Sequence, residues 1–340
     1  MKNRFIILVS IIFFSAKVNA ENILIEAKDI TLNKDQKTTI FKNDVSVETK
    51  EKKITSEFAE FNKNTQEIIL KNNIIAKDKL NNTIKTNYAE FNNIEKIFKT
   101  IGSTTLITSQ NYSLEGNDIY FDHKDKIMKS DKSAILKDQS GNTVFLDNFE
   151  YVATKSIFKS IGYVKIIDQF DNTYEFSQIY IDTKKKEVIG TDIKAFLNNQ
   201  DFKINSKNDP RVFANTMRLN KESSSFKKSV FTLCELKEDE KCPPWTLLAS
   251  DMTHDNKKKT IYYENAVIKI YDIPIFYLPF LSHPDPSVKR RTGLLPPTLS
   301  DGKNLGAGVS IPFFWSVNND KNFTVTSKLF VNENPLFIGE

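Results

Sequence analysis

The stretches KITSEFAEFN (53–62), TIKTNYAEFN (83–92), SLEGNDIYFD (113–122), VFLDNFEYVA (144–153) and YEFSQIYIDT (174–183) decide the fold of this chain. They recur every 30 residues, which places the following apolar residues in one column: Phe61, Phe91, Phe121, Tyr151 and Ile181. A second column at the same interval contains Ile68, Phe98, Met128, Phe158 and Val188. A repeat of this length predicts a stack of supersecondary units, each of which buries its apolar face against its neighbours.

Each unit has the pattern of β-strands. Apolar and polar residues alternate around Ala59 and Phe61, and again around Ile119 and Phe121, which is the period of a strand with one buried face. The apolar column that begins at Ile54 has the opposite parity, so we expect a bulge or a change of face near the middle of each strand. Polar segments such as 63–66 and 123–126 suit turns. The sequence therefore predicts an all-β fold of stacked hairpins.

The columns predict a long, continuous apolar interior. A methylene group removed from water contributes about 0.8 kcal/mol, so an apolar trough can hold a lipid without any catalytic group. A closed solenoid, in which the columns only fill their own core, is the alternative. The candidate lipid-binding residues of the interior are Phe61, Phe91, Phe121, Tyr151, Ile181, Phe98, Met128 and Phe158.

Residues 1–20 have the three parts of a signal peptide. Lys2 and Arg4 precede the apolar run FIILVSIIFF (5–14), and VNA (18–20) supplies small residues before Glu21. The run is too short to span a bilayer, which needs about 20 apolar residues. We therefore expect export from the cytoplasm, and an N-terminal anchor that is never cleaved is the alternative.

Composition excludes several classes of function. The chain has 48 Lys and Arg against 43 Asp and Glu, mixed along its length without a basic block, so nucleic acid is not an expected partner. The three histidines, His123, His254 and His283, are scattered, and no metal, cofactor or catalytic set is predicted. Cys234 and Cys242 are candidates for a disulfide, because exported chains meet an oxidising compartment.

The periodicity fades after about residue 200. Asn208-Asp209-Pro210 and the polar run 220–228 favour a connection with looser structure. A further hairpin is predicted over 246–271, with its turn at 255–258. Four prolines in 273–286 exclude a regular central strand or a helix there.

The last segment has a different strand pattern. Residues 305–317 alternate between apolar and small or polar side chains, and after a turn at 318–321 the alternation resumes over 323–331. A soluble strand averages about 5–6 residues, whereas a strand of a membrane barrel needs about 9–11 with this alternation. We expect the start of a transmembrane β-barrel at 304–340, incomplete because bacterial barrels have at least about 8 strands. A long edge hairpin of a soluble sandwich is the alternative.

In combination, these features resemble the outer-membrane lipopolysaccharide-assembly protein family (LptD, also OstA or Imp). The most specific stretch is 270–320. PIFYLPFL (274–281) is similar to the family motif P-[IV]-x-Y-L-P-[YF]-[LF], and RRTG (290–293) stands where a Lys/Arg-Ser/Thr-Gly segment leads into the first barrel strands. The repeat at 22–200 resembles the OstA-type β-jellyroll, which the bridge protein LptA shares. Four parts follow: a signal peptide (1–20), a periplasmic jellyroll (21–205), a connection (206–303) and barrel strands (304–340).

The resemblance implies a non-catalytic lipid carrier at the outer membrane. Its jellyroll would receive lipopolysaccharide from an LptA-like periplasmic bridge by β-strand addition, and an LptE-like lipoprotein would plug the barrel. A soluble LptA-like bridge protein is the alternative function, and a closed surface solenoid is a weaker one. Cys234 stands where the family has a cysteine that ties jellyroll to barrel. The family's partner cysteines are absent here, and a local disulfide between Cys234 and Cys242 is the other reading.

Overall fold

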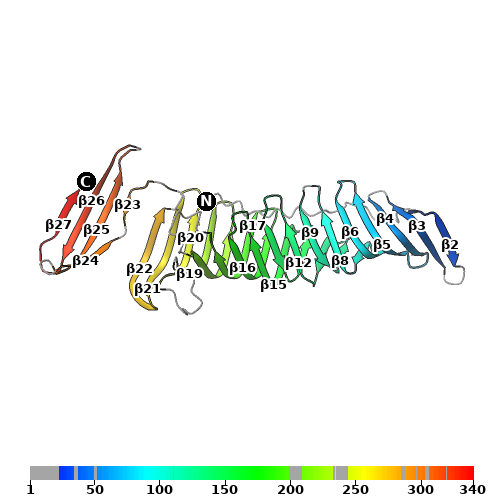
Figure 1. Ribbon diagram of the computed structural model, residues 1–340, viewed down its shortest axis with the longest axis horizontal. Helices are drawn as coiled ribbons and strands as arrows, with labels where there is room; N and C mark the ends of the chain where they lie inside the picture. Colours follow the sequence, from blue (N-terminus) through cyan, green and yellow to red (C-terminus); the bar gives the residue numbers. More distant parts are fainter. Residues whose placement is uncertain are drawn as a thin grey trace.

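The computed structural model is a long stack of β-strands with a second, smaller sheet at its C-terminal end (Figure 1). It describes residues 23–33, 37–49, 52–109, 111–198, 209–232, 234, 244–284, 288, 290–295, 297–302, 306–318 and 320–340. Every regular element in these ranges is a β-strand. The predicted all-β fold of stacked hairpins is confirmed.

The larger sheet is a single antiparallel stack. Its strands are β1 (Leu24–Glu26), β2 (Asp29–Asn33), β3 (Thr38–Glu48), β4 (Lys52–Asn62), β5 (Glu67–Asp78), β6 (Thr83–Asn92), β7 (Ile97–Thr100), β8 (Ser103–Ile107), β9 (Ser113–Asn117), β10 (Tyr120–Asp122), β11 (Ile127–Ser130), β12 (Ala134–Lys137), β13 (Thr143–Leu146), β14 (Phe149–Val152), β15 (Ile157–Ile167), β16 (Thr173–Asp182), β17 (Glu187–Phe196), β18 (Arg211–Leu219), β19 (Ser223–Thr232), β20 (Trp245–Asp255), β21 (Thr260–Ile270) and β22 (Ile273–Pro284).

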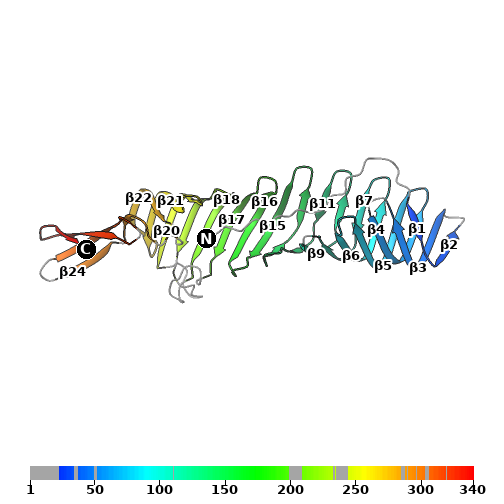
Figure 2. The same ribbon diagram turned by 90° about the horizontal axis from the view of Figure 1, so that it is seen from above.

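The strands pair in chain order from one end of the molecule to the other. β1 and β2 pair with the two halves of β3, which then pairs with β4. In the middle of the stack the two halves are separate strands: β7 and β8 both pair with β6, and β13 and β14 both pair with β15. Because each strand, or strand pair, is bent at its middle, the halves form two facing layers (Figure 2).

A column of bends explains the change of parity. The register shifts between Thr55 and Phe58 in the β4–β5 pair, and equivalent shifts occur in the β3–β4, β5–β6 and β15–β16 pairs. Asn72 (φ 64°), Gly102 (φ 80°) and Gly162 (φ 132°) stand at the bends at 30-residue multiples. Positive φ suits glycine and, in the left-handed region, asparagine. The bulge predicted for each strand is confirmed in these pairs.

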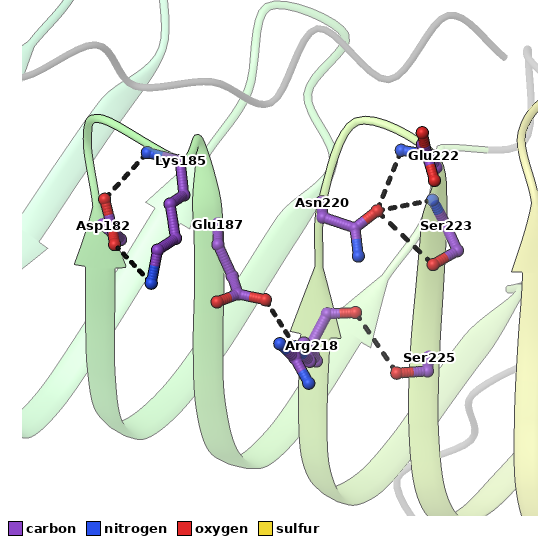
Figure 3. A network of polar contacts seen from close by, with 8 residues as sticks. All are labelled: Asp182, Lys185, Glu187, Arg218, Asn220, Glu222, Ser223 and Ser225. Carbon is purple, nitrogen blue, oxygen red and sulfur yellow. Dashed lines mark hydrogen bonds and ion pairs between the residues drawn. The ribbon is translucent and has the colours of Figure 1, made fainter.

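A second column of special residues makes the turns at one end of the strands. Asn62, Asn92, Asp122 and Asp182 each accept hydrogen bonds from the backbone N–H groups two and three residues later. Figure 3 shows the bond from the Lys185 N–H to Asp182, together with the ion pair between Glu187 and Arg218 on neighbouring strands. Side-chain caps of this kind satisfy backbone donors that the sheet leaves unpaired, so the same turn can be repeated along the stack.

The sheet extends further than the sequence predicted. β18 to β22 continue the antiparallel pairing in order, so the larger sheet extends past residue 205 to Pro284, within the segment 206–303 that was predicted as a connection. The predicted hairpin at 246–271 is confirmed as β20 and β21. The proline-rich segment forms β22, which pairs only with β21 among the described residues. It is an edge strand, the place in a sheet where proline is tolerated.

The smaller sheet has five strands. They are β23 (Gly293–Leu294), β24 (Thr298–Gly302), β25 (Gly306–Ser316), β26 (Asn322–Phe330) and β27 (Leu336–Gly339). The hairpin predicted from 305–317 and 323–331 is confirmed as β25 and β26, whose register runs from Gly308–Phe330 to Ser316–Asn322. Its place in a membrane barrel stays a prediction.

Candidate functional site

The predicted interior residues lie in one row across the larger sheet. Strand by strand, each faces the next in register: Phe61, Ile68, Phe91, Phe98, Phe121, Met128, Tyr151, Phe158, Ile181 and Val188. We call this the first ladder. Seven of the eight predicted lipid-binding residues are buried, and Phe61 is half-buried against the core. Their contact with lipid stays a prediction, but the geometry brings all eight together.

A second ladder crosses the other half of each bent strand. Its members, again in register, are Val47, Ile54, Ala76, Ile84, Leu106, Leu114, Leu136, Val144, Ile166, Tyr174, Ala195 and Val212. The bends bring the two layers face to face, and both ladders belong to one apolar core. Ring centroids of Phe98 and Phe121 lie 5.9 Å apart, and those of Phe149 and Phe158 lie 6.3 Å apart. The protein's own side chains therefore fill the interior in this conformation.

The strand ends of the two layers meet along one side of the stack, which we call the mouth. Lys52 begins β4, at the second-ladder end, and His123 follows β10, at the first-ladder end. The Lys52 Nζ lies 3.5 Å from His123 Nε2, although the residues are 71 positions apart. The same Nζ lies 4.3 Å from the ring centroid of Phe91, a member of the first ladder. Lys52 thus crosses the mouth and covers the apolar interior at this point.

The second-ladder side of the mouth is lined by buried asparagines. Asn82, Asn142 and Asn172 are 6%, 3% and 2% exposed. Each donates a hydrogen bond to the aspartate four residues before it and accepts one from a backbone N–H 26 or 27 residues later. One turn is therefore tied to the next along the mouth. This feature was not predicted, although the repeated spacing of an aspartate four residues before an asparagine is visible in the sequence: Asp78-Asn82, Asp138-Asn142 and Asp168-Asn172.

A cationic group on the first-ladder side was also missed. Lys96 Nζ donates to Asn93 Oδ1 at 2.8 Å, and the Lys96 carbonyl accepts the His123 N–H at 3.0 Å. Burial, and then the charges of Lys52 and Lys96, lower the pKa of His123 from 6.5 to about 3. The imidazole is therefore neutral at physiological pH. Since an ammonium group only donates, Nε2 accepts from Lys52 and the ring proton is on Nδ1.

The smaller sheet presents an uncovered apolar face. The register places Val309 beside Leu329, Phe313 beside Val325, and Trp315 beside Phe323 on the same face of β25 and β26. Phe313 is 40% exposed and Trp315 is 53% exposed. Soluble proteins rarely leave contiguous apolar patches uncovered, so this face is suited to an apolar environment.

The remaining predicted sites are only partly described. Cys234 is half-buried, with Sγ 3.8 Å from the carbonyl oxygen of Trp245. Cys242 and residues 1–20 lie outside the described residues, so the disulfide and the signal peptide stay predictions. Within the described ranges, no group of three or more His, Cys, Asp or Glu could hold a metal ion. The described part of the chain also has no helix of the length and hydropathy needed to cross a membrane.

Comparison with known proteins gives a consistent set of relatives. No family model matches the chain. It is 36% identical over 103 residues to the LPS-assembly protein LptD of Nitrosomonas eutropha, a match that covers 30% of this chain and 14% of that protein. The match to LptD of Albidiferax ferrireducens is 29% identical over 194 residues and covers 55% of this chain and 23% of the relative. The chain thus spans less than a quarter of the length of either.

A solved structure shows a weaker likeness. It is LptH of Pseudomonas aeruginosa, described as the LptA homologous periplasmic component of the lipopolysaccharide transport device. The match has 16% identity and a TM-score of 0.14 and covers 49% of this chain and 80% of LptH, and such a TM-score is too low to establish a shared fold. The sequence matches are therefore the stronger likeness: parts of the chain are similar to LPS-assembly proteins LptD, at 26–36% identity over 103–194 residues.

Proposed function

We propose that this chain carries lipopolysaccharide to the outer membrane without chemical change, with the acyl chains held between the two ladders. The observation that carries this proposal is the continuous row of apolar side chains, which runs from Phe61 to Val188 without a polar interruption. An acyl chain that enters the interior can replace the contacts between the protein's own apolar side chains. Burial of a methylene group contributes a similar free energy whether the group belongs to the lipid or to the protein. The LptD relatives, named as LPS-assembly proteins, support the same substrate.

The two ends of the molecule suit the remaining proposed partners. At the N-terminal end, β2 pairs only with β3 among the described residues, and Ile30 and Leu32 on it are more than half exposed. An LptA-like periplasmic bridge would add a strand at this edge. At the C-terminal end, the apolar face of β25 and β26 would contact the outer membrane as part of a barrel, with an LptE-like lipoprotein plug inside. The signal peptide at 1–20 would deliver the chain to the periplasm.

Equilibrium competition tests the proposed substrate. The purified chain is titrated with fluorescently labelled lipopolysaccharide, and two unlabelled competitors are compared: intact lipopolysaccharide and the polysaccharide freed of its lipid. Because the apolar interior recognises acyl chains, only the intact molecule should displace the label. Failure of the chain to bind the label, or equal displacement by the lipid-free polysaccharide, would contradict the proposed function.

A further inference from the structure

A basic surface lies at one end of the last strands of the larger sheet. It consists of the turn regions 182–187, 218–223 and 255–260 together with Arg290 and Arg291, and we call it the basic patch. It contains ten basic and four acidic residues, which gives a net charge of +6, and all seven of its lysines are exposed. The sequence has no long basic block, so the fold creates this surface by placing separate turns side by side.

Polar contacts join the three turns of the basic patch. Arg218 on β18 forms an ion pair with Glu187 at the start of β17, and Figure 3 shows the first two turns at the same end of these neighbouring strands. The Asn256 N–H donates to the Glu222 carbonyl at 2.9 Å, and Asn256 Nδ2 donates to the Lys221 carbonyl at 3.4 Å. The second turn is therefore tied to the third, and the three form one continuous surface.

Most acidic groups of the basic patch are turned towards the protein. Asp182 and Asp255 accept backbone N–H groups of their own turns, and these hydrogen bonds lower the pKa of both carboxyls. The Lys185 side chain is 74% exposed, whereas that of its partner Asp182 is only 17% exposed, and Lys258 and Asp255 differ in the same way. Glu222 is exposed. A partner that approaches the turns therefore meets mainly ammonium groups.

Acidic residues across the mouth do not reverse this charge. The turns at 138–142 and 168–172, on the second-ladder side, contain Asp138, Asp168 and Asp171. The first two accept hydrogen bonds from the asparagines that line the mouth, and Asp171 is exposed. Even if all three were counted with the basic patch, its net charge would stay positive.

The turn conformation does not require these lysines. Four earlier turns of the same column contain only five basic residues against four acidic ones: 62–67, 92–97, 122–127 and 152–157. The position with positive φ is held by Gln66 in the first of them (φ 55°) and by Lys186 (φ 57°) and Lys259 (φ 50°) in the basic patch. The lysines are therefore concentrated at the C-terminal end of the stack for a reason other than the fold of the turn.

The basic patch adjoins the aromatic end of the smaller sheet. Arg291 donates from Nη1 to Thr260 Oγ1 in the third turn, and Thr292 Oγ1 accepts the Ser316 N–H at 3.0 Å at the end of β25. Trp315, next to Ser316, is more than half exposed on the uncovered apolar face. Aromatic side chains are enriched where a membrane meets water, and anionic headgroups attract lysine and arginine close to that level. The two features thus suit the same membrane surface.

We infer that the basic patch binds the anionic phospholipid headgroups of the membrane leaflet that faces the periplasm. The inference rests on the membrane contact proposed for β25 and β26 and adds a polar contact beside it. The lysines are spread over three turns, so each can meet a different phosphate, which suits a surface with many separate charges. These contacts would hold the C-terminal end of the larger sheet against the membrane.

Vesicle flotation with the full chain tests the inference. The probes are vesicles of phosphatidylcholine alone and vesicles of phosphatidylcholine mixed with phosphatidylglycerol. The test variant carries four substitutions, which Gln66 shows to be compatible with the turn: Lys184→Gln, Lys186→Gln, Lys257→Gln and Lys259→Gln. The control variant removes the same charge from exposed lysines of other turns: Lys63→Gln, Lys79→Gln, Lys124→Gln and Lys155→Gln.

The unchanged chain should bind the anionic vesicles more tightly than the phosphatidylcholine vesicles. The test variant should bind the anionic vesicles at least about tenfold more weakly than the unchanged chain, because each lysine near an anionic surface adds to the attraction. Its affinity for phosphatidylcholine vesicles, and both affinities of the control variant, should not change.

Equal losses in the two variants would show a response to net charge alone and would overturn the inference. Equal affinities of the unchanged chain for the two kinds of vesicle would do the same. Stronger binding to polyglutamate than to anionic vesicles at the same concentration of charge would assign the patch to an acidic protein instead. The competition assay with labelled lipopolysaccharide separates these results from the proposed function. A chain that binds lipopolysaccharide without preferring anionic vesicles overturns the inference alone, and the opposite combination overturns the proposed function alone.

Discussion

Acid should weaken the middle of the stack through His123. The imidazole is half-buried at the mouth beside Lys52 and Lys96, and its pKa is about 3 in the folded chain against 6.5 for an ordinary histidine. Below pH 6.5 the unfolded chain binds a proton that the folded chain does not. The stability linked to this group is therefore complete above pH 6.5 and is lost progressively as the pH falls towards 3.

The size of the effect follows from the pKa difference. Each pH unit below 6.5 removes about 1.4 kcal/mol while the folded imidazole stays neutral, so pH 5 removes at most about 2 kcal/mol. The matched variant is His123→Asn, because Asn93 holds the equivalent position one repeat earlier. An asparagine does not titrate in this range, whereas every carboxylate is common to both chains.

The assay compares the two chains at pH 7.5 and pH 5. Urea denaturation gives the free energy of unfolding, and amide hydrogen exchange in β10 and β11 locates the change within the stack. The unchanged chain should lose about 2 kcal/mol more than His123→Asn between the two pH values. With only three histidines in the sequence, proton NMR can follow each ring directly. Equal losses in the two chains, or an NMR pKa for His123 above 6, would show that His123 is not held neutral by burial and the neighbouring lysines.

Four further outcomes follow from burial, backbone conformation and exposure. Phe158→Ala should lower the free energy of unfolding by about 3–5 kcal/mol in urea denaturation, and a loss under about 1 kcal/mol would show that the first ladder is not tightly packed. Gly162→Ala should destabilise by about 1–3 kcal/mol, because φ 132° is a glycine conformation and its new Cβ would meet Asp147 Oδ2 at 3.1 Å. Gly102→Asn, at φ 80° with open space around it, should stay within about 1 kcal/mol of the unchanged chain, and a larger loss would contradict the bend model. In a Trp245→Phe chain, the emission of Trp315 should shift to the blue on addition of phospholipid vesicles, and an unshifted spectrum would argue against a membrane-facing β25.

The repeat could be predicted from the sequence, because each strand buries one face and its apolar residues therefore recur at a fixed interval. Phe91 and Phe121 are 30 residues apart, and the structure places both in the first ladder. The opposite parity of Ile54 correctly predicted the bend, since a residue can reach the same core only if the strand changes face between 54 and 59. The local alternation of apolar and polar residues thus predicts both the strands and the bulges within them.

The parts that could not be predicted depend on contacts between distant turns or on longer connections. Lys52 and His123 meet only because the bends fold the strand ends together, and no local pattern encodes that contact. The continuation into β18 was missed because the segment between Phe196 and Arg211 is longer than the short turns of the repeat, which breaks the 30-residue period. The pairing of β17 with β18 depends on the register of the two strands and not on the length of the segment that connects them.

Photo-crosslinking at two adjacent residues tests the central claim, that the apolar interior holds lipopolysaccharide acyl chains. Phe121 faces the interior, and Tyr120, beside it on β10, faces outward between Lys99 and Lys129. A benzophenone side chain is placed at each position in turn, and the chain is irradiated in cells that make lipopolysaccharide. A lipopolysaccharide adduct is expected at position 121 and none at position 120. An adduct at position 120 alone, or at neither position in a folded and exported chain, would contradict it.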